Sequence, residues 1–352
     1  MEWAKPLHSK GALDRAGKVL VSDDDLEDLG KWLELDNATR IINNWRASHN
    51  YPLNTFKVTL RSKAAEIDPD RVVAQRIKRM SSIESKLHRF PGMRMSQMQD
   101  IGGCRAILAT TKNVRELVTR YEKSDLKHKL ERIDDYISSP KPSGYRSVHL
   151  IYKYNSDKQA PSVYNGLSIE LQFRSRLQHV WATAVETVGT FLNQAFKSSQ
   201  GEDRWLRFFA LMGTVFAKRE GAAQTIVPNT PQKKQELVAE VRQLASDLNV
   251  LNALEMYATT VDIGLEGAVR GDHYFLLKLE PRAGKMTVTG FKKRDIDRAS
   301  EQYLLAEKQI AQTPGSEAVL VSVDSLAVLE RAYPNYFLDT KVFLDELRRA
   351  IK

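Results

Sequence analysis

Apolar residues recur at helical spacing over the first fifty residues of the chain. Ser22 precedes three aspartates, and carboxylates favour the start of a helix because they complement its dipole. Apolar side chains then return every three or four positions, first at Leu26, Leu29 and Leu33 and again between residues 37 and 49. The pattern predicts that the chain opens with two helices.

From residue 72 the spacing changes to two, which is typical of a strand. The alternation places Ala74, Arg76 and Lys78 on one face of that strand. Further strand-like runs cover residues 103–110, 130–136, 146–154 and 167–173, and helical runs cover residues 82–89, 113–123, 177–192, 205–216 and 235–251. We therefore predict an α+β fold in which helices flank a mixed β-sheet.

The alternation of side chains that is typical of a strand returns near residue 273. Residues 274–279 and 286–291 flank Pro281-Arg282-Ala283-Gly284, which predicts a hairpin. A helix at 295–311, a strand at 318–323 and a last helical region complete a small β-β-α-β-α module, which we expect to pack on the first sheet. The predicted parts are N-terminal helices (1–50), a first sheet domain (51–220), a helical connector (221–270) and a C-terminal module (271–352).

Composition limits the class of protein. Hydrophobic residues make up 42% of the 352 residues, and no apolar run approaches the roughly 20 residues that a membrane span requires. The N-terminus lacks the basic and apolar stretch of a secretory signal. The single cysteine, Cys104, lies in an apolar run, so we expect it in the core of a cytoplasmic protein.

The chain is basic, with 53 lysines and arginines against 44 acidic residues and a formal net charge of +9. Such an excess occurs on ordinary solvated surfaces. It also suits a polyanionic partner such as RNA. Charge alone leaves both interpretations open.

Polar residues share one face of the strand predicted at residues 167–173. Glu170, Gln172 and Arg174 alternate with apolar residues there, and Asp100 stands at the entrance to a strand from which Arg105 projects. Carboxylates from two adjacent strands can hold Mg²⁺, which takes hard oxygen ligands from protein, phosphates and water. Two unrelated surface acids would give the same pattern.

Cations gather after the first predicted strand. Arg76 and Lys78 share one strand face, and Lys86 follows Ser82 by one helical turn. Arginine can stack on an adenine and lysine serves as a point charge for phosphate, so this run is a candidate phosphate site. Cations near a turn also serve solubility alone.

A tight turn is predicted between Lys141 and His149. Gly144 supplies permissive backbone angles and directs Tyr145 away from the sheet. We expect an exposed ring there, suited to stacking on a base. The alternative is a tyrosine that packs back on its own sheet.

Taken in order, these elements resemble the RelA/SpoT-type synthetase domain, which has a nucleotidyltransferase-like fold. The resemblance covers about residues 50–200 and rests on four motifs, namely Arg76-x-Lys78-x-x-x-Ser82-Ile83-x-x-Lys86, Asp100-Ile101-Gly102-Gly103-x-Arg105, Lys141-Pro142-Ser143-Gly144-Tyr145-Arg146-Ser147-Val148-His149 and Glu170-x-Gln172-x-Arg174. It implies an ATP-dependent pyrophosphokinase, a transferase that moves pyrophosphate from ATP to a ribose 3′-hydroxyl.

The resemblance also implies a role for each motif residue. ATP would be bound by Arg76, Lys78, Ser82, Lys86 and Arg105. The catalytic residues, which would also hold the Mg²⁺ cofactor, would be Asp100 and Glu170. The acceptor would contact Tyr145, Arg146, His149, Gln172 and Arg174. His179, which shares a helix face with Glu186, is expected only to line the domain surface.

The C-terminal module carries a further motif, Tyr333-Pro334-Asn335-Tyr336. Proline discourages regular helix, so the two rings can project from a bend, although aromatic pairs more often belong to a core. The motif resembles the fused toxin-antitoxin synthetases of the CapRel group. That resemblance implies a pseudo-zinc-finger-like regulatory module whose tyrosines, Tyr333 and Tyr336, occlude the ATP site.

The same resemblance implies a conditional toxin that modifies the 3′-CCA end of tRNA and blocks translation. Its trigger would be a phage protein such as the capsid protein, in antiviral defence by abortive infection. Six cations could then guide the acceptor stem, namely Lys57, Arg61, Lys63, Arg71, Arg79 and Arg89. The alternatives are a (p)ppGpp synthetase with GDP or GTP as acceptor, and a catalytically inactive RNA-binding or sensor module that keeps only the fold. No membrane or DNA partner is expected.

Overall fold

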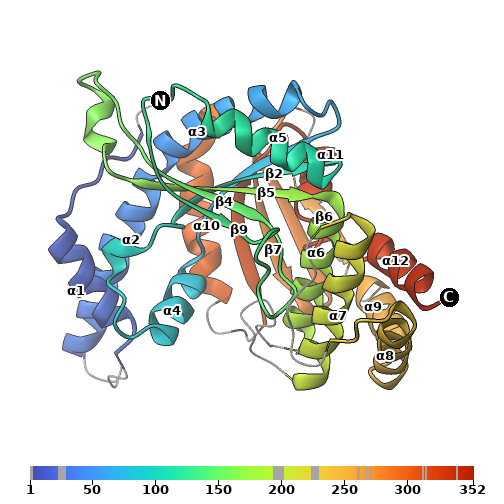
Figure 1. Cartoon of the computed structure of the whole chain (residues 1–352). Helices are drawn as coiled ribbons and strands as arrows, with labels where there is room; N and C mark the ends of the chain where they lie inside the picture. The colour runs from blue at the N-terminus through green and yellow to red at the C-terminus, as the bar shows by residue number, and fades with distance from the viewer. Residues whose placement is uncertain are drawn as a thin grey trace.

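The computed structural model describes residues 3–22, 29–192, 202–222, 230–259, 262–266, 268, 271–310, 313, 315–337 and 340–352. These residues form a nine-stranded sheet with helices on both faces (Figure 1). Its strand order is β3-β4-β5-β2-β1-β9-β7-β8-β6. The strands are β1 Val72–Ile77, β2 Gly102–Leu108, β3 Lys129–Asp135, β4 Val148–Lys153, β5 Ser168–Ser175, β6 Asp262–Glu266, β7 Tyr274–Glu280, β8 Lys285–Phe291 and β9 Glu317–Ser322.

Strand direction changes inside the sheet. β2 and β5 run parallel, whereas β1 is antiparallel to β2 and β4 is antiparallel to β5. The alternation predicted from residue 72 is present, because Val73 and Ile77 are buried on one face and Ala74 on the other. The predicted α+β fold with a mixed, helix-flanked sheet is confirmed.

The two faces of the sheet carry different helices. α3 (Asn50–Ala65) and α5 (Thr111–Glu122) bury their apolar side chains on one face, and α10 (Ile296–Ile310) packs on that face over β7 and β9. α11 (Leu326–Ala332) and the residues after it pack on the opposite face. We call this opposite face the α11 face.

The N-terminal helices build a small core of their own beside the sheet. It contains α1 (Lys10–Leu20), α2 (Leu29–Ser48) and α4 (Met80–Arg89). α2 is one continuous helix, so the two helical runs predicted between residues 22 and 49 belong to a single helix, and α1 was not predicted. No glycine or proline separates the two apolar patterns, so nothing breaks the helix between them. The predicted start at Asp23 to Leu26 lies outside the described residues.

His49 lies at the α2–α3 junction and is only 1% exposed. Its Nδ1 lies 2.7 Å from the carbonyl oxygen of Trp45, and burial lowers the pKa of His49 from 6.5 to about 4. Between these pH values the unfolded chain binds a proton that the folded chain excludes. We therefore expect the free energy of unfolding to decrease as the pH falls from 6.5 to 4, measured by urea denaturation. The His49→Asn variant should show a smaller decrease, and an equal one would contradict the argument.

Five helices form a separate cluster at one side of the sheet (Figure 1). The helix predicted at residues 235–251 is in fact two helices. Asn249 has a positive φ of 48°, a left-handed conformation that ends a helix and that asparagine tolerates. The cluster comprises α6 (Arg176–Leu192), α7 (Asp203–Arg219), α8 (Lys234–Asp247), α9 (Val250–Thr259) and α12 (Lys341–Ile351).

The C-terminal strands continue the first sheet. β7 and β8 form the predicted hairpin, which turns at Gly284 with a φ of 60° that glycine adopts without a Cβ clash. β9 pairs with β7 on one side and with β1 on the other. The β1–β9 junction consists of two residue pairs, Gln75 with Ser322 and Arg76 with Val321. The domain boundaries and the regulatory identity of the C-terminal module stay predictions.

Cys104 is buried in β2, as predicted, and its Sγ lies 3.7 Å from the carbonyl oxygen of Leu53. Burial raises the pKa of this thiol to about 12. In the part of the chain that the structure describes, no helix combines the length and the apolar character needed to cross a membrane.

Candidate active site

Six of the predicted site residues line one cavity on the α11 face. They come from β1, β2 and β5, which are neighbours in the sheet, and from the segments that join β1 to β2. Tyr333 of the C-terminal module lines the same cavity. The six residues are Arg76, Lys78, Asp100, Arg105, Glu170 and Gln172.

Asp100 is held between two lysines. The Nζ atoms of Lys78 and Lys86 each lie 2.9 Å from one of its carboxylate oxygens. Burial alone would raise the pKa of Asp100, but the two ammonium groups outweigh burial and hold the pKa well below its ordinary value. The cations predicted to bind phosphate therefore neutralise a carboxylate in this arrangement.

Glu170 is paired with an imidazole. His149 Nδ1 donates to Glu170 Oε1 over 2.8 Å, and Gln172 Nε2 donates to Oε2 over 2.6 Å. Burial alone would raise the pKa of Glu170, but the charge of His149 outweighs burial and lowers it. Burial alone would lower the pKa of His149, but Tyr145 and Glu170 raise it to about 9. Glu170 and His149 therefore form an ion pair at neutral pH.

Tyr145 is 6% exposed, so the predicted exposed ring is wrong. Its hydroxyl accepts a hydrogen bond from Arg174 Nη2 at 2.8 Å and lies 2.7 Å from His149 Nε2. The ring packs edge-on against Trp181 of α6. α7 covers the turn, because Gly144 lies against the backbone of that helix. The alternative, in which the tyrosine packs inward, is the correct one.

Two of the predicted residues lie elsewhere. Arg146 points under α7, where its Nη1 donates to the carbonyl oxygens of Gly213 at 2.9 Å and Gly144 at 3.3 Å. It lines a separate small cavity with Glu220, and burial lowers the pKa of Arg146 to about 10. Arg146 therefore supports packing in this arrangement. Ser82 is half-buried in the first turn of α4.

The C-terminal tyrosines are both buried, at 3% and 2% exposure. The hydroxyl of Tyr333 donates to the carbonyl oxygen of Gln75 over 3.4 Å. The Arg105 guanidinium lies 5.7 Å from the centre of the Tyr333 ring, and Arg105 Nη1 donates to the carbonyl oxygen of Ala332 over 3.4 Å. The hydroxyl of Tyr336 accepts from Arg79 Nη1 over 3.4 Å.

His179 also meets the C-terminal module. It is 7% exposed, and its Nε2 lies 3.1 Å from the carbonyl oxygen of Arg331. Burial, followed by the charges of Arg105 and Arg174, lowers the pKa of His179 well below its ordinary value. The predicted position on the domain surface is wrong, because α11 covers this part of α6.

Three of the cations proposed to guide RNA contact the C-terminal module instead. Lys57 is buried and its Nζ donates to Ser322 Oγ over 2.8 Å. Arg61 pairs with Asp324, and Arg79 pairs with Glu317. Sequence spacing carried no signal for these contacts, since each joins residues more than two hundred positions apart.

The cavity is small, and Tyr333 of the C-terminal module forms part of its wall. Its volume is about 50 Å³. Pockets that hold drug-sized ligands have volumes of roughly 300–1,000 Å³. In this arrangement the site has no room for a nucleoside triphosphate.

The carboxylates fit a magnesium ion only in part. Asp100 and Glu170 line the same cavity, and the charge of Asp100 acts on Glu170. Within the described residues, no group of three or more His, Cys, Asp or Glu side chains could hold a metal. Mg²⁺ is commonly held by one or two carboxylates while substrate phosphates and water complete its shell. Asp100 and Glu170 therefore suit Mg²⁺ that arrives with a polyphosphate.

Residues 75–190 match the model of a family described as a region found in RelA / SpoT proteins. The resemblance predicted from the four motifs is confirmed for this region. GTP pyrophosphokinase YjbM from Bacillus subtilis (strain 168) is 32% identical over 130 residues, which cover 36% of this chain and 59% of the relative. GTP pyrophosphokinase YwaC from the same organism is 29% identical over 132 residues, which cover 36% of this chain and 61% of the relative.

The chain thus spans less than two thirds of the length of either relative. Among solved structures, the crystal structure of small alarmone synthetase 1 from Bacillus subtilis bound to its product pppGpp has a TM-score of 0.42 and 21% sequence identity. That match covers 49% of this chain and 89% of the other.

Proposed function

We propose that this chain, whose residues 75–190 form a RelA/SpoT region, transfers pyrophosphate from ATP to a hydroxyl acceptor and is held inactive by its own C-terminal segment. One observation carries the proposal. Tyr333 lies in the cavity that gathers Arg76, Lys78, Asp100, Arg105 and Glu170. The residues suited to a triphosphate and the residue that blocks it therefore share one site.

The proposed chemistry depends on charge and position. Phosphoryl-type transfer needs neutralised phosphate oxygens and an in-line hydroxyl, and little covalent help from the protein. Arg76, Lys78, Lys86 and Arg105 supply four cations for the phosphates. Glu170 is ionised and can accept the proton of the attacking hydroxyl. Mg²⁺ held by Asp100 and Glu170 would add charge neutralisation at the transferred group.

We propose the 3′-CCA end of tRNA as the acceptor, which makes the protein a translation-blocking toxin. The support is the buried Tyr-x-x-Tyr segment over the site, the arrangement implied by the resemblance to the fused toxin-antitoxin synthetases. The net charge of +9 suits a polyanion. Release of the module would also free Lys57, Arg61 and Arg79 for contact with RNA phosphates.

A guanine nucleotide is the second candidate acceptor. The observation in its favour is that both curated relatives are named GTP pyrophosphokinase. In that case the product would be (p)ppGpp, and the C-terminal module would regulate an alarmone synthetase.

We propose a protein trigger for release, in antiviral defence a phage structural protein such as the capsid protein. To change the ratio of closed to open molecules from 99:1 to 1:99, a trigger must bind the open state roughly 10⁴-fold more tightly than the closed state, a difference of about 5.5 kcal/mol. A protein interface can supply such a difference.

The acceptor can be identified with an opened variant, Tyr333→Ala/Tyr336→Ala, incubated with Mg²⁺ and ATP labelled in its γ-phosphate. We expect label on deacylated tRNA and little on GDP or GTP. The control is tRNA that ends in 3′-deoxyadenosine, which has no terminal 3′-hydroxyl and should stay unlabelled. Label on GDP or GTP instead would establish the second candidate. A folded protein that labels neither would contradict pyrophosphate transfer.

A further inference from the structure

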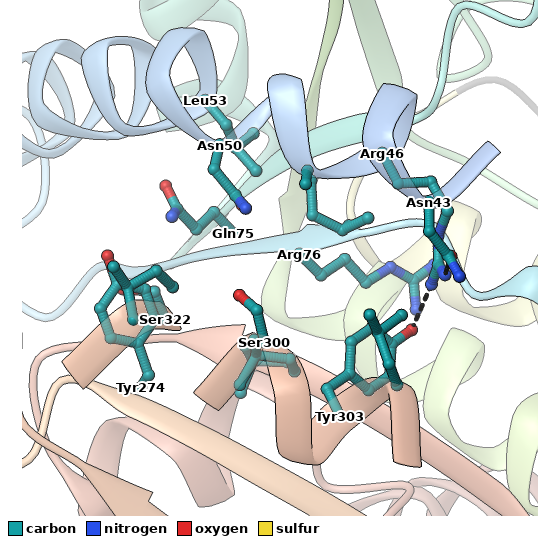
Figure 2. Close-up of a pocket in the computed structure, with 16 residues that line it drawn as sticks. Asn43, Arg46, Asn50, Leu53, Gln75, Arg76, Tyr274, Ser300, Tyr303 and Ser322 are labelled. Carbon is teal, nitrogen blue, oxygen red and sulfur yellow. Dashed lines mark hydrogen bonds between the residues drawn. The ribbon is translucent and has the colours of Figure 1, made fainter. Parts of the chain in front are cut away.

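A buried arginine joins the two ends of the chain on the face opposite α11. Arg46 of α2 is 2% exposed. Its Nη2 donates to the hydroxyl of Tyr303 over 2.7 Å, and Figure 2 shows its side chain reaching toward Tyr303 at the edge of a cavity between α2 and α10. Its Nη1 donates to Glu307 Oε2 over 2.8 Å and to Asn43 Oδ1 over 2.7 Å.

Glu307 is shared by several donors. Its Oε1 accepts from Arg46 Nη2 at 3.0 Å and from the Tyr303 hydroxyl at 2.7 Å. The same oxygen accepts from the backbone N–H of Met80 at 2.9 Å. Met80 is the first residue of α4, and a carboxylate there also complements the helix dipole.

The pair holds both ends of the turn between β1 and α4. Arg46 Nε donates to the carbonyl oxygen of Lys78 over 2.9 Å, and Glu307 Oε1 accepts a hydrogen bond from the backbone N–H of Met80. The N–H of Lys78 donates to the carbonyl oxygen of Ile101 over 2.8 Å. This turn carries Lys78 and leads into the helix of Ser82 and Lys86, the proposed phosphate ligands. We call residues 78–80 the phosphate turn.

We propose that Arg46 is a positioning residue for the phosphate turn and that Glu307 is a latch that ties this turn to the C-terminal module. The proposal rests on the proposed function and names a regulatory contact distinct from the tyrosines. Tyr333 and Tyr336 hold β1 from the α11 face, whereas Glu307 acts from α10 on the opposite face. The module therefore contacts β1 on the α11 face and the phosphate turn that follows β1 on the opposite face.

The two residues should behave differently when the module leaves. Asn43 and the Lys78 carbonyl belong to the N-terminal part of the chain, so Arg46 keeps these two partners. Glu307 departs with α10, and the phosphate turn loses its contact at Met80. Loss of Glu307 should thus open the module, whereas loss of Arg46 should also disturb ATP binding.

Hydrogen exchange of the Glu307→Gln variant tests the latch without any assumption about activity. Removing one partner of a buried ion pair leaves the other charge buried without a counter-charge. The ratio of closed to open molecules should therefore fall by roughly 100-fold. We expect the amides of β1 and β9 at their two-pair junction to exchange at least 10-fold faster than in the unmodified protein. The matched control is Glu301→Gln, an exposed position on the same helix. Unchanged exchange in a folded Glu307→Gln protein would overturn the latch.

Arg46 is tested in the Tyr333→Ala/Tyr336→Ala background, where the module no longer limits access. Arg46→Gln should weaken binding of a non-hydrolysable ATP analogue about 10-fold by calorimetry, and Arg46→Lys should restore part of the loss. Arg40→Gln serves as control, because Arg40 lies on the same helix with its side chain 73% exposed. Equal affinity in all variants, or loss of affinity only through unfolding, would overturn the positioning role. Analogue binding without transfer to any acceptor would instead count against the proposed function.

Discussion

Replacing Tyr333 and Tyr336 together by alanine is expected to raise basal pyrophosphate transfer by up to ~100-fold. Truncating a buried aromatic residue costs roughly 3–5 kcal/mol, and 3 kcal/mol already changes an equilibrium more than ~100-fold. Both rings are buried against β1 and β9, so the cost falls on the closed arrangement. The rate of ATP consumption with the acceptor present measures the effect, and growth arrest on expression reports it in cells.

Phenylalanine variants separate ring packing from hydrogen bonding. The hydroxyls of Tyr333 and Tyr336 make contacts of 3.4 Å only, so Tyr→Phe at either position should change the basal rate by less than a few-fold. If the double alanine variant keeps its sheet, by circular dichroism, and still shows the rate of the unmodified protein, the segment does not inhibit.

Asp100→Asn and Glu170→Gln should each reduce transfer at least ~10³-fold in the opened variant. A general base contributes about 10²–10⁴-fold, and loss of a carboxylate also removes a candidate ligand of Mg²⁺. Glu170→Gln keeps the size of the side chain, so the fold should persist. Asp100→Asn leaves Lys78 and Lys86 without their shared counter-charge. Labelled phosphate on the acceptor is the measurement, with melting temperature recorded for each protein.

A surface acid provides the control for these two changes. Asp157 pairs with Lys127 and is exposed, so Asp157→Asn should leave the rate unchanged. Full activity of the Glu170→Gln protein would remove Glu170 from the chemistry and leave its ion pair with His149 as a structural feature.

The sequence predicted which side chains lie together, because side chains two positions apart on a strand point to the same face of the sheet. Arg76, Arg105 and Glu170 come from three strands, and each points to the α11 face as the alternation requires. Local spacing also placed Lys86 one turn after Ser82. These features depend only on backbone geometry within one element.

The burial of Tyr145 and His179 could not be predicted in the same way. Each depends on elements distant in sequence, since α7 lies against Gly144 in the turn of Tyr145 and α11 contacts His179. Arg46 and Glu307 were missed for the same reason, since they are 261 positions apart. α3 was missed although Leu53, Phe56, Leu60 and Ala64 recur at helical spacing, and those side chains form its buried face.

The two-pair junction between β1 and β9 has a consequence for synthesis of the protein on the ribosome. The strands that line the cavity and α6 leave the ribosome before the segment that covers them. Roughly 140 residues lie between the end of α6 and Tyr333. At about 5–20 residues per second, these residues take roughly 7–28 s to make. During that interval β1 has an open edge, a surface prone to pairing with other strands. Each new molecule therefore passes through a period without the segment that we propose to be inhibitory, and slower translation lengthens that period.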